Sequence, residues 1–208
     1  MDEWLEGLRE RWGILALALL AGSGGLWWWQ GRPLSQRPGV LAPEGPVQTA
    51  PDATAAPWAF RDHTLTPLAA FEIRARVLGA ERYRFDRAAE LSPVDLALGW
   101  GPMSDSRILE AFRIDQRDRW YFWRAAQMPI PEGEVIRHSA NMHMIPANEA
   151  IGRRLKAARV GQVVRLKGKL VRADGKDGWH WASSLTRADT GDGSCEVIWV
   201  EAAQVTDR

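Results

Sequence analysis

The stretch GQVVRLKGKL, residues 161–170, decides the fold of the C-terminal third of the chain. Val164, Leu166 and Leu170 alternate there with charged side chains, which is the period of a strand that buries one face. Gly168 stands in the middle, where a strand can bend sharply around a small barrel. We therefore expect a long strand that opens at Gly161 and turns one face to a core.

One helix and two further strands are predicted on either side of this strand. Turn signals at 174–178 and 189–193 precede expected strands over 179–186 and 196–205. A helix is expected over 147–158, where apolar side chains recur on one face. A helix, a long strand with a central glycine and two antiparallel strands, in this order, are similar to part of an OB-type barrel.

The middle of the chain carries shorter signals. We expect a strand over 71–77, a helix that starts at Ser92-Pro93, a short helix over 104–110, a hairpin of 112–116 with 120–124, and extended segments over 135–138 and 141–145. Together these elements predict an α+β fold over residues 58–208, with a mostly antiparallel, β-rich, OB-like or small-barrel domain and one or two short helices.

An apolar run near the N-terminus predicts a membrane anchor. Residues 12–29, WGILALALLAGSGGLWWW, carry no charge and follow a charged stub of residues 1–11. As a helix the run spans about 27 Å, close to the hydrocarbon thickness of a bilayer. Tryptophans lie at both of its ends, where indoles prefer the headgroup layer. We expect a single transmembrane helix that contacts membrane lipid, in preference to a buried core helix.

A cleaved signal peptide is the alternative, because the small residues Ala21 and Ser23 suit a signal peptidase. The tryptophan triplet at 27–29 favours the anchor, since a mature N-terminus gains nothing from three exposed indoles. Arginines flank both ends of the run almost equally, so they specify the orientation poorly. A short stub, one anchor and a large C-terminal domain favour an inner-membrane protein with a periplasmic domain in a bacterium.

Residues 30–57 form a predicted linker. Six of the twelve prolines of the chain fall here, among Ala, Gly, Gln and Thr. Such a segment is too poor in large apolar side chains to order itself, and proline stiffens it toward polyproline II. We expect a semi-rigid spacer that holds the domain away from the bilayer.

Composition excludes some classes of function. The formal net charge of +1 is too small to indicate a nucleic-acid partner. The single cysteine, Cys195, rules out a disulfide within the chain and a lipoprotein anchor. We predict no cofactor and no metal site, because the spacing of His138, His143 and His180 matches no familiar zinc pattern. His143 between two methionines is expected to be a core or hydrogen-bonded histidine.

Polar residues gather at the turn before the last strand. Ser183, Ser184, Arg187 and Asp189 lie close to Cys195 there. One interpretation has Arg187 bind an anionic group while hydroxyls complete the cradle. The other, which we favour, is a well-capped turn. A serine hydrolase would need Ser183 or Ser184 near His143 or His180, together with Asp95. A cysteine hydrolase would need Cys195 near one of the same histidines. No nucleophile-elbow motif supports a hydrolase.

Three tryptophans complete the candidate binding residues, which also include Asn141 and His143. Trp179 and Trp181 share one side of a predicted strand, where they stack on a ligand if exposed and fill a core if buried. Trp100 lies between two glycines in a predicted loop that either covers a barrel mouth or docks on a partner.

Three blocks, ELSPVDLALGWG (90–101), ANMHMIPA (140–147) and WHWASSLTR (179–187), resemble an uncharacterised family of bacterial single-pass membrane-anchored proteins. The resemblance covers roughly residues 68–205. It implies an OB-like, β-rich C-terminal part and transfers no catalytic role.

Anchor, spacer and the lack of a specific catalytic motif predict a binding or assembly module. We expect an accessory subunit in a membrane complex, with a protein partner and no nucleic acid. The alternatives are a membrane-tethered hydrolase and an OB-like ligand-binding domain.

Overall fold

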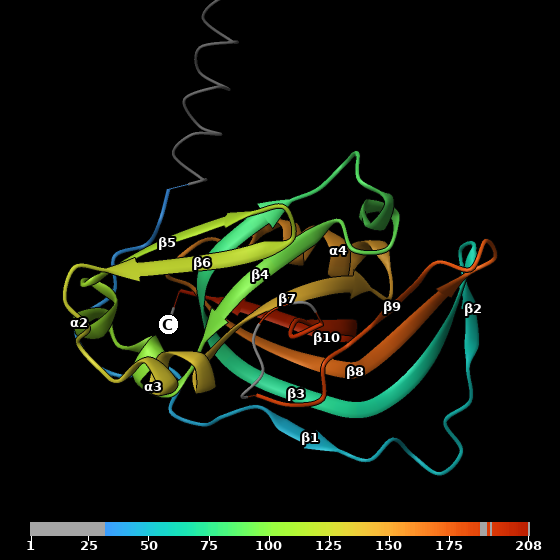
Figure 1. Ribbon diagram of the computed structural model, residues 1–208, viewed down its shortest axis with the longest axis horizontal. Coiled ribbons are helices and arrows are strands. Elements are labelled where there is room, and N and C mark those ends of the chain that lie inside the picture. Colours follow the sequence, from blue (N-terminus) through green and yellow to red (C-terminus); the bar gives the residue numbers. More distant parts are fainter. Residues whose placement is uncertain (1–31, 188–190, 192, 208) are drawn as a thin grey trace, which may run out of the picture. The chain divides into compact units, whose positions relative to one another are not determined.

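Five strands form a closed ring at the centre of the protein (Figure 1). The computed structural model describes residues 32–187, 191 and 193–207. The order around the ring is β3 (His63–Arg82), β4 (Val94–Gly99), β7 (Ser139–Pro146), β10 (Glu196–Thr206) and β8 (Val163–Gly175), which pairs again with β3. All neighbours are antiparallel except β7 and β10, which are parallel. The predicted β-rich domain is confirmed.

Glycine at the centre of β8 allows the ring to close. A Cβ on Gly168 would lie 1.8 Å from the carbonyl oxygen of Trp199 on β10, so no other residue fits without moving backbone. The register of β8 and β10 shifts beside this contact, between Val200 and Ala202. A bulge of this kind bends a strand, as barrel closure requires. The expected bend at Gly168 therefore coincides with a close approach between two strands.

Alternating side chains of the ring strands fill its interior, because successive residues of a strand point to opposite faces. The inner residues include Phe71, Ile73, Leu96, Leu98, Met142, Met144, Leu166, Leu170, Ile198 and Val200. Helix α4 (Glu149–Ala157) adds Ile151 and Leu155 to this core. Asn148 caps α4, since its side-chain oxygen accepts from the backbone N–H of Ile151 at 3.0 Å. This helix and the strand that follows it agree with the prediction.

A separate hairpin, β5 (Phe112–Arg117) and β6 (Trp120–Ala125), packs on the outside of the ring. Its two-residue turn has Asp118 at φ 53° and Arg119 at φ 67°, the left-handed conformation of a type I′ turn. The side-chain amide of Gln116 donates to Asn141 on β7 at 2.6 Å, which ties the hairpin to the ring. The predicted hairpin is confirmed.

Two local predictions are wrong. The helix expected to start at Ser92-Pro93 is strand β4, because Val94–Gly99 is buried and pairs with β3 on one side and β7 on the other. Conversely, the extended segment expected over 135–138 belongs to helix α3 (Glu132–Arg137), whose N-cap is Pro131. Pairing partners distant in sequence override local propensity at β4. In α3 the backbone instead bonds locally, since His138 N–H donates to the carbonyl of Glu134 at 3.1 Å. The strand expected over 179–186 is only the short β9 (His180–Ala182).

Of the remaining short elements, β2 (Trp58–Phe60) precedes β3 and pairs with it, and the others lie between ring strands. These others are η1 (Arg87–Glu90), η2 (Gly101–Ser104) and α2 (Ser106–Leu109), the last within the helix predicted over 104–110.

The prediction of a spacer over residues 30–57 is wrong from residue 34 onward. One compact unit begins at Leu34 rather than at Trp58. Strand β1 (Val47–Thr49) pairs with β3. Leu34 N–H donates to Val160 at 2.8 Å, and Ala42 is fully buried. An extended, proline-rich chain keeps enough backbone N–H and C=O groups to bond along a domain, so its composition did not preclude packing.

The predicted stub and transmembrane helix, residues 1–29, lie outside the described residues. Among the residues that the structure does describe, no helix is long and apolar enough to span a bilayer.

Candidate functional site

Strand β7 presents a row of polar side chains on the outer face of the ring. Ser139, Asn141 and His143 alternate with the core residues Met142 and Met144, so they point outward, yet all three are buried. Residues of the hairpin β5–β6 and of the described stretches 183–187 and 193–196 lie around them. A buried polar row on the outside of a barrel is a place where specific recognition or chemistry can occur.

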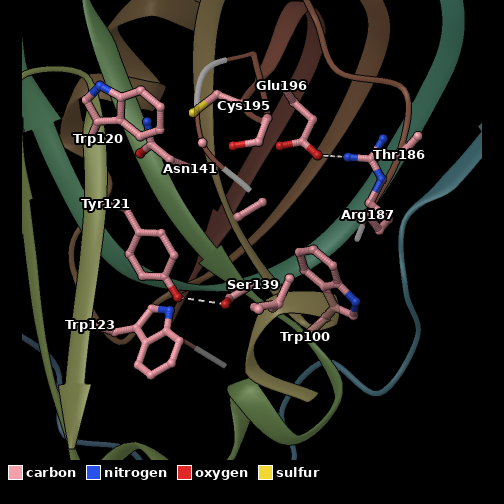
Figure 2. Close-up of a pocket in the computed structure, with 14 residues that line it drawn as sticks. Trp100, Trp120, Tyr121, Trp123, Ser139, Asn141, Thr186, Arg187, Cys195 and Glu196 are labelled. Atoms are coloured by element: carbon pink, nitrogen blue, oxygen red, sulfur yellow. Dashed lines mark hydrogen bonds and ion pairs between the residues drawn. The ribbon is translucent and has the colours of Figure 1, made fainter. Parts of the chain in front are cut away.

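The first of two cavities over this row is the aromatic pocket, of about 180 Å³. Its walls are mainly aromatic and its lining includes Trp100, Trp120, Tyr121, Trp123, Ser139, Asn141, Thr186, Arg187, Cys195 and Glu196 (Figure 2). Trp120, Tyr121 and Trp123 come from β6, and the last four from the segment before and at the start of β10. The pocket is therefore assembled by pieces of chain distant in sequence.

One polar contact in the aromatic pocket joins β6 to β7. The hydroxyls of Tyr121 and Ser139 are 2.7 Å apart, and Ser139 donates to the carbonyl of Val135 at 2.7 Å. Burial raises the pKa of Tyr121 to about 12. Burial thus disfavours the phenolate, and the neutral phenol shares its hydrogen bond with Ser139.

An ion pair between Arg187 and Glu196 lies at another side of the aromatic pocket (Figure 2). Glu196 is 1 % exposed, and the guanidinium of Arg187 also lies over the ring of Phe71 and donates to Gln48 at 2.6 Å. Because Glu196 already balances Arg187, the anion cradle proposed for this arginine has no net positive charge to offer. The pair instead ties the end of the described stretch 183–187 to the start of β10.

The serines of this segment serve its backbone. Ser183 donates to the carbonyl of Ser184 at 2.8 Å and accepts from Val197 N–H at 3.1 Å. The hydroxyl of Ser184 accepts from Thr186 N–H at 3.1 Å. These bonds match the capped-turn interpretation. Asp189, the remaining member of the predicted cluster, lies outside the described residues.

The second cavity, which we call the indole hollow, has about 460 Å³. Trp179, Trp181, His143, His180 and Arg119 line it, and Trp120 and Cys195 line both cavities. The rings of Trp181 and His143 lie 4.4 Å apart between centroids, and those of Trp179 and Trp181 6.1 Å apart. Both indoles are half-buried. Of the three histidines weighed as zinc ligands, only His143 and His180 share this hollow; His138 instead contacts Glu134.

Asp95 organises the polar floor of the indole hollow. Its Oδ1 accepts from Arg119 Nη1 at 2.8 Å, and its Oδ2 lies 2.9 Å from His143 Nδ1. The second contact is close but lacks the alignment of a regular hydrogen bond. Arg119 also binds Asp86 at 2.7 Å and lies 3.7 Å from the centroid of the Tyr83 ring. We call Asp95, Asp86, Arg119 and His143 the Asp95 network.

The structure thus brings together some of the predicted residues and separates others. Asn141, Trp100 and Arg187 line the aromatic pocket, whereas His143, Trp179 and Trp181 line the indole hollow. Trp100 is 3 % exposed and packs with the barrel core, so it does not project from the surface as a docking knob.

The sequence did not point to Arg119, nor to the β6 residues Trp120, Tyr121 and Trp123 that form one wall of the aromatic pocket. The hairpin was recognised, and its tryptophan-rich second strand was the signal that could have found the wall. No signal marked Arg119, which reaches Asp95 only because a two-residue turn places it over β7.

No family model, curated protein or solved structure matches this chain. The resemblance to bacterial membrane-anchored proteins therefore stays a prediction.

Proposed function

We propose that the protein is a binding or assembly module, an accessory subunit that a single-pass anchor holds in a bacterial envelope membrane. The aromatic pocket is the observation that carries this proposal. Four large aromatic side chains line this cavity together, and the anchor run over residues 12–29 supplies the expected membrane attachment. A periplasmic domain belongs to the same proposal.

The dimensions of the aromatic pocket favour a protein partner. A cavity of about 180 Å³ is smaller than the roughly 300–1,000 Å³ typical of small-molecule sites. It suits one large apolar side chain. Protein interfaces concentrate their binding energy in such anchors, seated in desolvated pockets. Trp120 and Trp123 would supply most of the contact area.

We further infer that the domain is OB-like. The ring order β3-β4-β7-β10-β8, with α4 between the third and fourth ring strands along the chain, supports this assignment. OB-type domains bind ligands on the face of their second and third strands, between the loops that follow the first and fourth. Here those strands correspond to β4 and β7, and residues of β7 line both cavities.

The test is a pull-down of the tagged full-length protein, expressed at native level and extracted in mild detergent, with quantitative mass spectrometry. Trp123→Ala should abolish a stoichiometric partner, because it removes a wall of the pocket. Phe122→Ala is the matched control: this neighbour is 41 % exposed and does not line the pocket. Recovery of the same partner with both variants, or of the protein alone, would refute the proposal.

A membrane-tethered hydrolase is the second candidate. The contact of His143 with Asp95, and the presence of Cys195 in the same hollow, favour it. The backbone bonds of Ser183 weigh against a serine nucleophile. Hydrolysis of p-nitrophenyl acetate that disappears in Cys195→Ala and in His143→Gln would support this candidate. If the unsubstituted protein hydrolyses this ester no faster than the two variants do, the candidate is excluded for esters.

A further inference from the structure

We propose that the indole hollow is a carbohydrate site that binds a neutral sugar unit of an oligosaccharide. This inference rests on the OB-like assignment of the domain but not on the protein partner. It concerns a different cavity from the aromatic pocket.

The volume and position of the hollow suit a small ligand. About 460 Å³ falls within the range of small-molecule sites. The hollow lies over β7, between the segment after β3, which carries Asp86 and Ala88, and residues 179–182, 193 and 195 of the chain after β8. These segments follow the first and fourth ring strands, and such loops frame oligonucleotide and oligosaccharide sites in OB-type domains.

The indoles supply an apolar platform. Trp179 and Trp181 are tilted 56° to each other and both border the hollow. The ring of Trp181 contacts His143 and the guanidinium of Arg119, and the ring of Trp179 contacts Arg87, whose guanidinium lies 5.2 Å from its centroid. A held indole loses little conformational freedom when it binds a ligand. Its face can pack against the C–H side of a sugar ring, as aromatic platforms do against other rings.

Charge balance distinguishes a sugar from a nucleic acid. Arg119 is the only arginine or lysine among the described residues that line the hollow, and Asp86 and Asp95 already bind it. Binding to a phosphate chain depends on cationic side chains that release counterions. The hollow offers instead polar groups without a surplus of positive charge, beside aromatic faces. Neutral hydroxyl groups match that surface better than phosphates do.

The experiment titrates the full-length protein, in a zwitterionic detergent that contains no sugar, with chitotetraose, cellotetraose, maltotetraose and octathymidylate. Tryptophan fluorescence and saturation-transfer NMR report binding. We expect at least one tetrasaccharide to bind saturably. Trp181→Ala should weaken that binding about tenfold or more, because it removes one stacking platform.

Trp123→Ala is the matched control, since this tryptophan lines the aromatic pocket and not the indole hollow. It should leave sugar affinity unchanged, so this test and the pull-down can fail independently. Trp179→Ala provides a second variant in case Trp181→Ala unfolds the domain, as circular dichroism would show. The proposal is overturned if no tetrasaccharide binds at millimolar concentration, if octathymidylate binds instead, or if only Trp123→Ala weakens binding.

Discussion

Replacing Asp95 with asparagine tests whether the Asp95 network supports the fold. The carboxylate is fully buried and contacts Arg119 at 2.8 Å and His143 at 2.9 Å. Asparagine keeps the size of the side chain but removes its charge. Where its NH₂ group is directed toward Arg119, the guanidinium also loses a hydrogen-bond acceptor.

The expected loss can be estimated from the burial of the partners. Removing one member of a buried ion pair costs about 3–5 kcal/mol, mostly because the other charge is left uncompensated. Arg119 keeps Asp86 and its side chain is 16 % exposed, so the lower end applies. We expect the free energy of unfolding to fall by about 3 kcal/mol. For a domain of this size, that lowers the melting temperature by about 6–12 °C.

Urea denaturation followed by far-UV circular dichroism measures this loss. The midpoint should fall while the slope of the free energy against urea stays constant, because the exposed surface does not change. Asp177→Asn is the matched control: it makes the same change in the exposed pair with Arg87, and its midpoint should not shift measurably. Equal midpoints for the two variants would refute the supporting role of the network.

Three further predictions concern other parts of the fold. Burial raises the pKa of both tyrosines of the chain, Tyr83 and Tyr121, to about 12, so the stability present below pH 10 should decline as the pH rises from 10 toward 12. The absorbance at 295 nm follows the ionisation of the tyrosines. A titration midpoint near pH 10 in the native protein would contradict the prediction. Gly168→Ala should destabilise by about 2 kcal/mol or more, because its Cβ meets the Trp199 carbonyl. Gly152 in α4 has room for a Cβ, so Gly152→Ala should stabilise the fold by about 0.5–1 kcal/mol. Thermal unfolding measures the two glycine variants, and equal changes in their stability would contradict this prediction. A chain that starts at residue 58 should melt at a lower temperature than one that starts at residue 34, since it lacks β1; identical melting temperatures would mean that residues 34–57 do not contribute.

Regular patterns within single segments were sufficient for several elements. The alternation over 161–170 predicted most of the inward face of β8, and the two apolar positions of α4 predicted the face that packs on the core. The two short runs on either side of Arg117-Asp118 predicted the hairpin, whose turn lies one residue later, at Asp118-Arg119. In each case the residues that decide the conformation are neighbours along the chain, so their spacing carries the information.

Segments whose partners are distant in sequence could not be predicted in this way. Ser92-Pro93 favours a helix locally, yet β4 is a strand because β3 and β7 pair with both its edges. The segment 34–57 has the composition of a spacer, yet it finds bonding partners on the domain at Val160 and on β3. Local propensity amounts to tenths of a kilocalorie per residue, which pairing and burial readily exceed.

By itself the sequence determined a β-rich domain, a central strand that must bend at Gly168, and residues such as His143 and Trp181 that could recognise a ligand. Only the tertiary structure decided that β7 turns its polar row outward beneath the β5–β6 hairpin, and that Arg119 and Asp95 meet there. The reason is geometric. The period of a strand indicates which residues share a face, but the closure of the ring and the position of the hairpin determine what that face contacts.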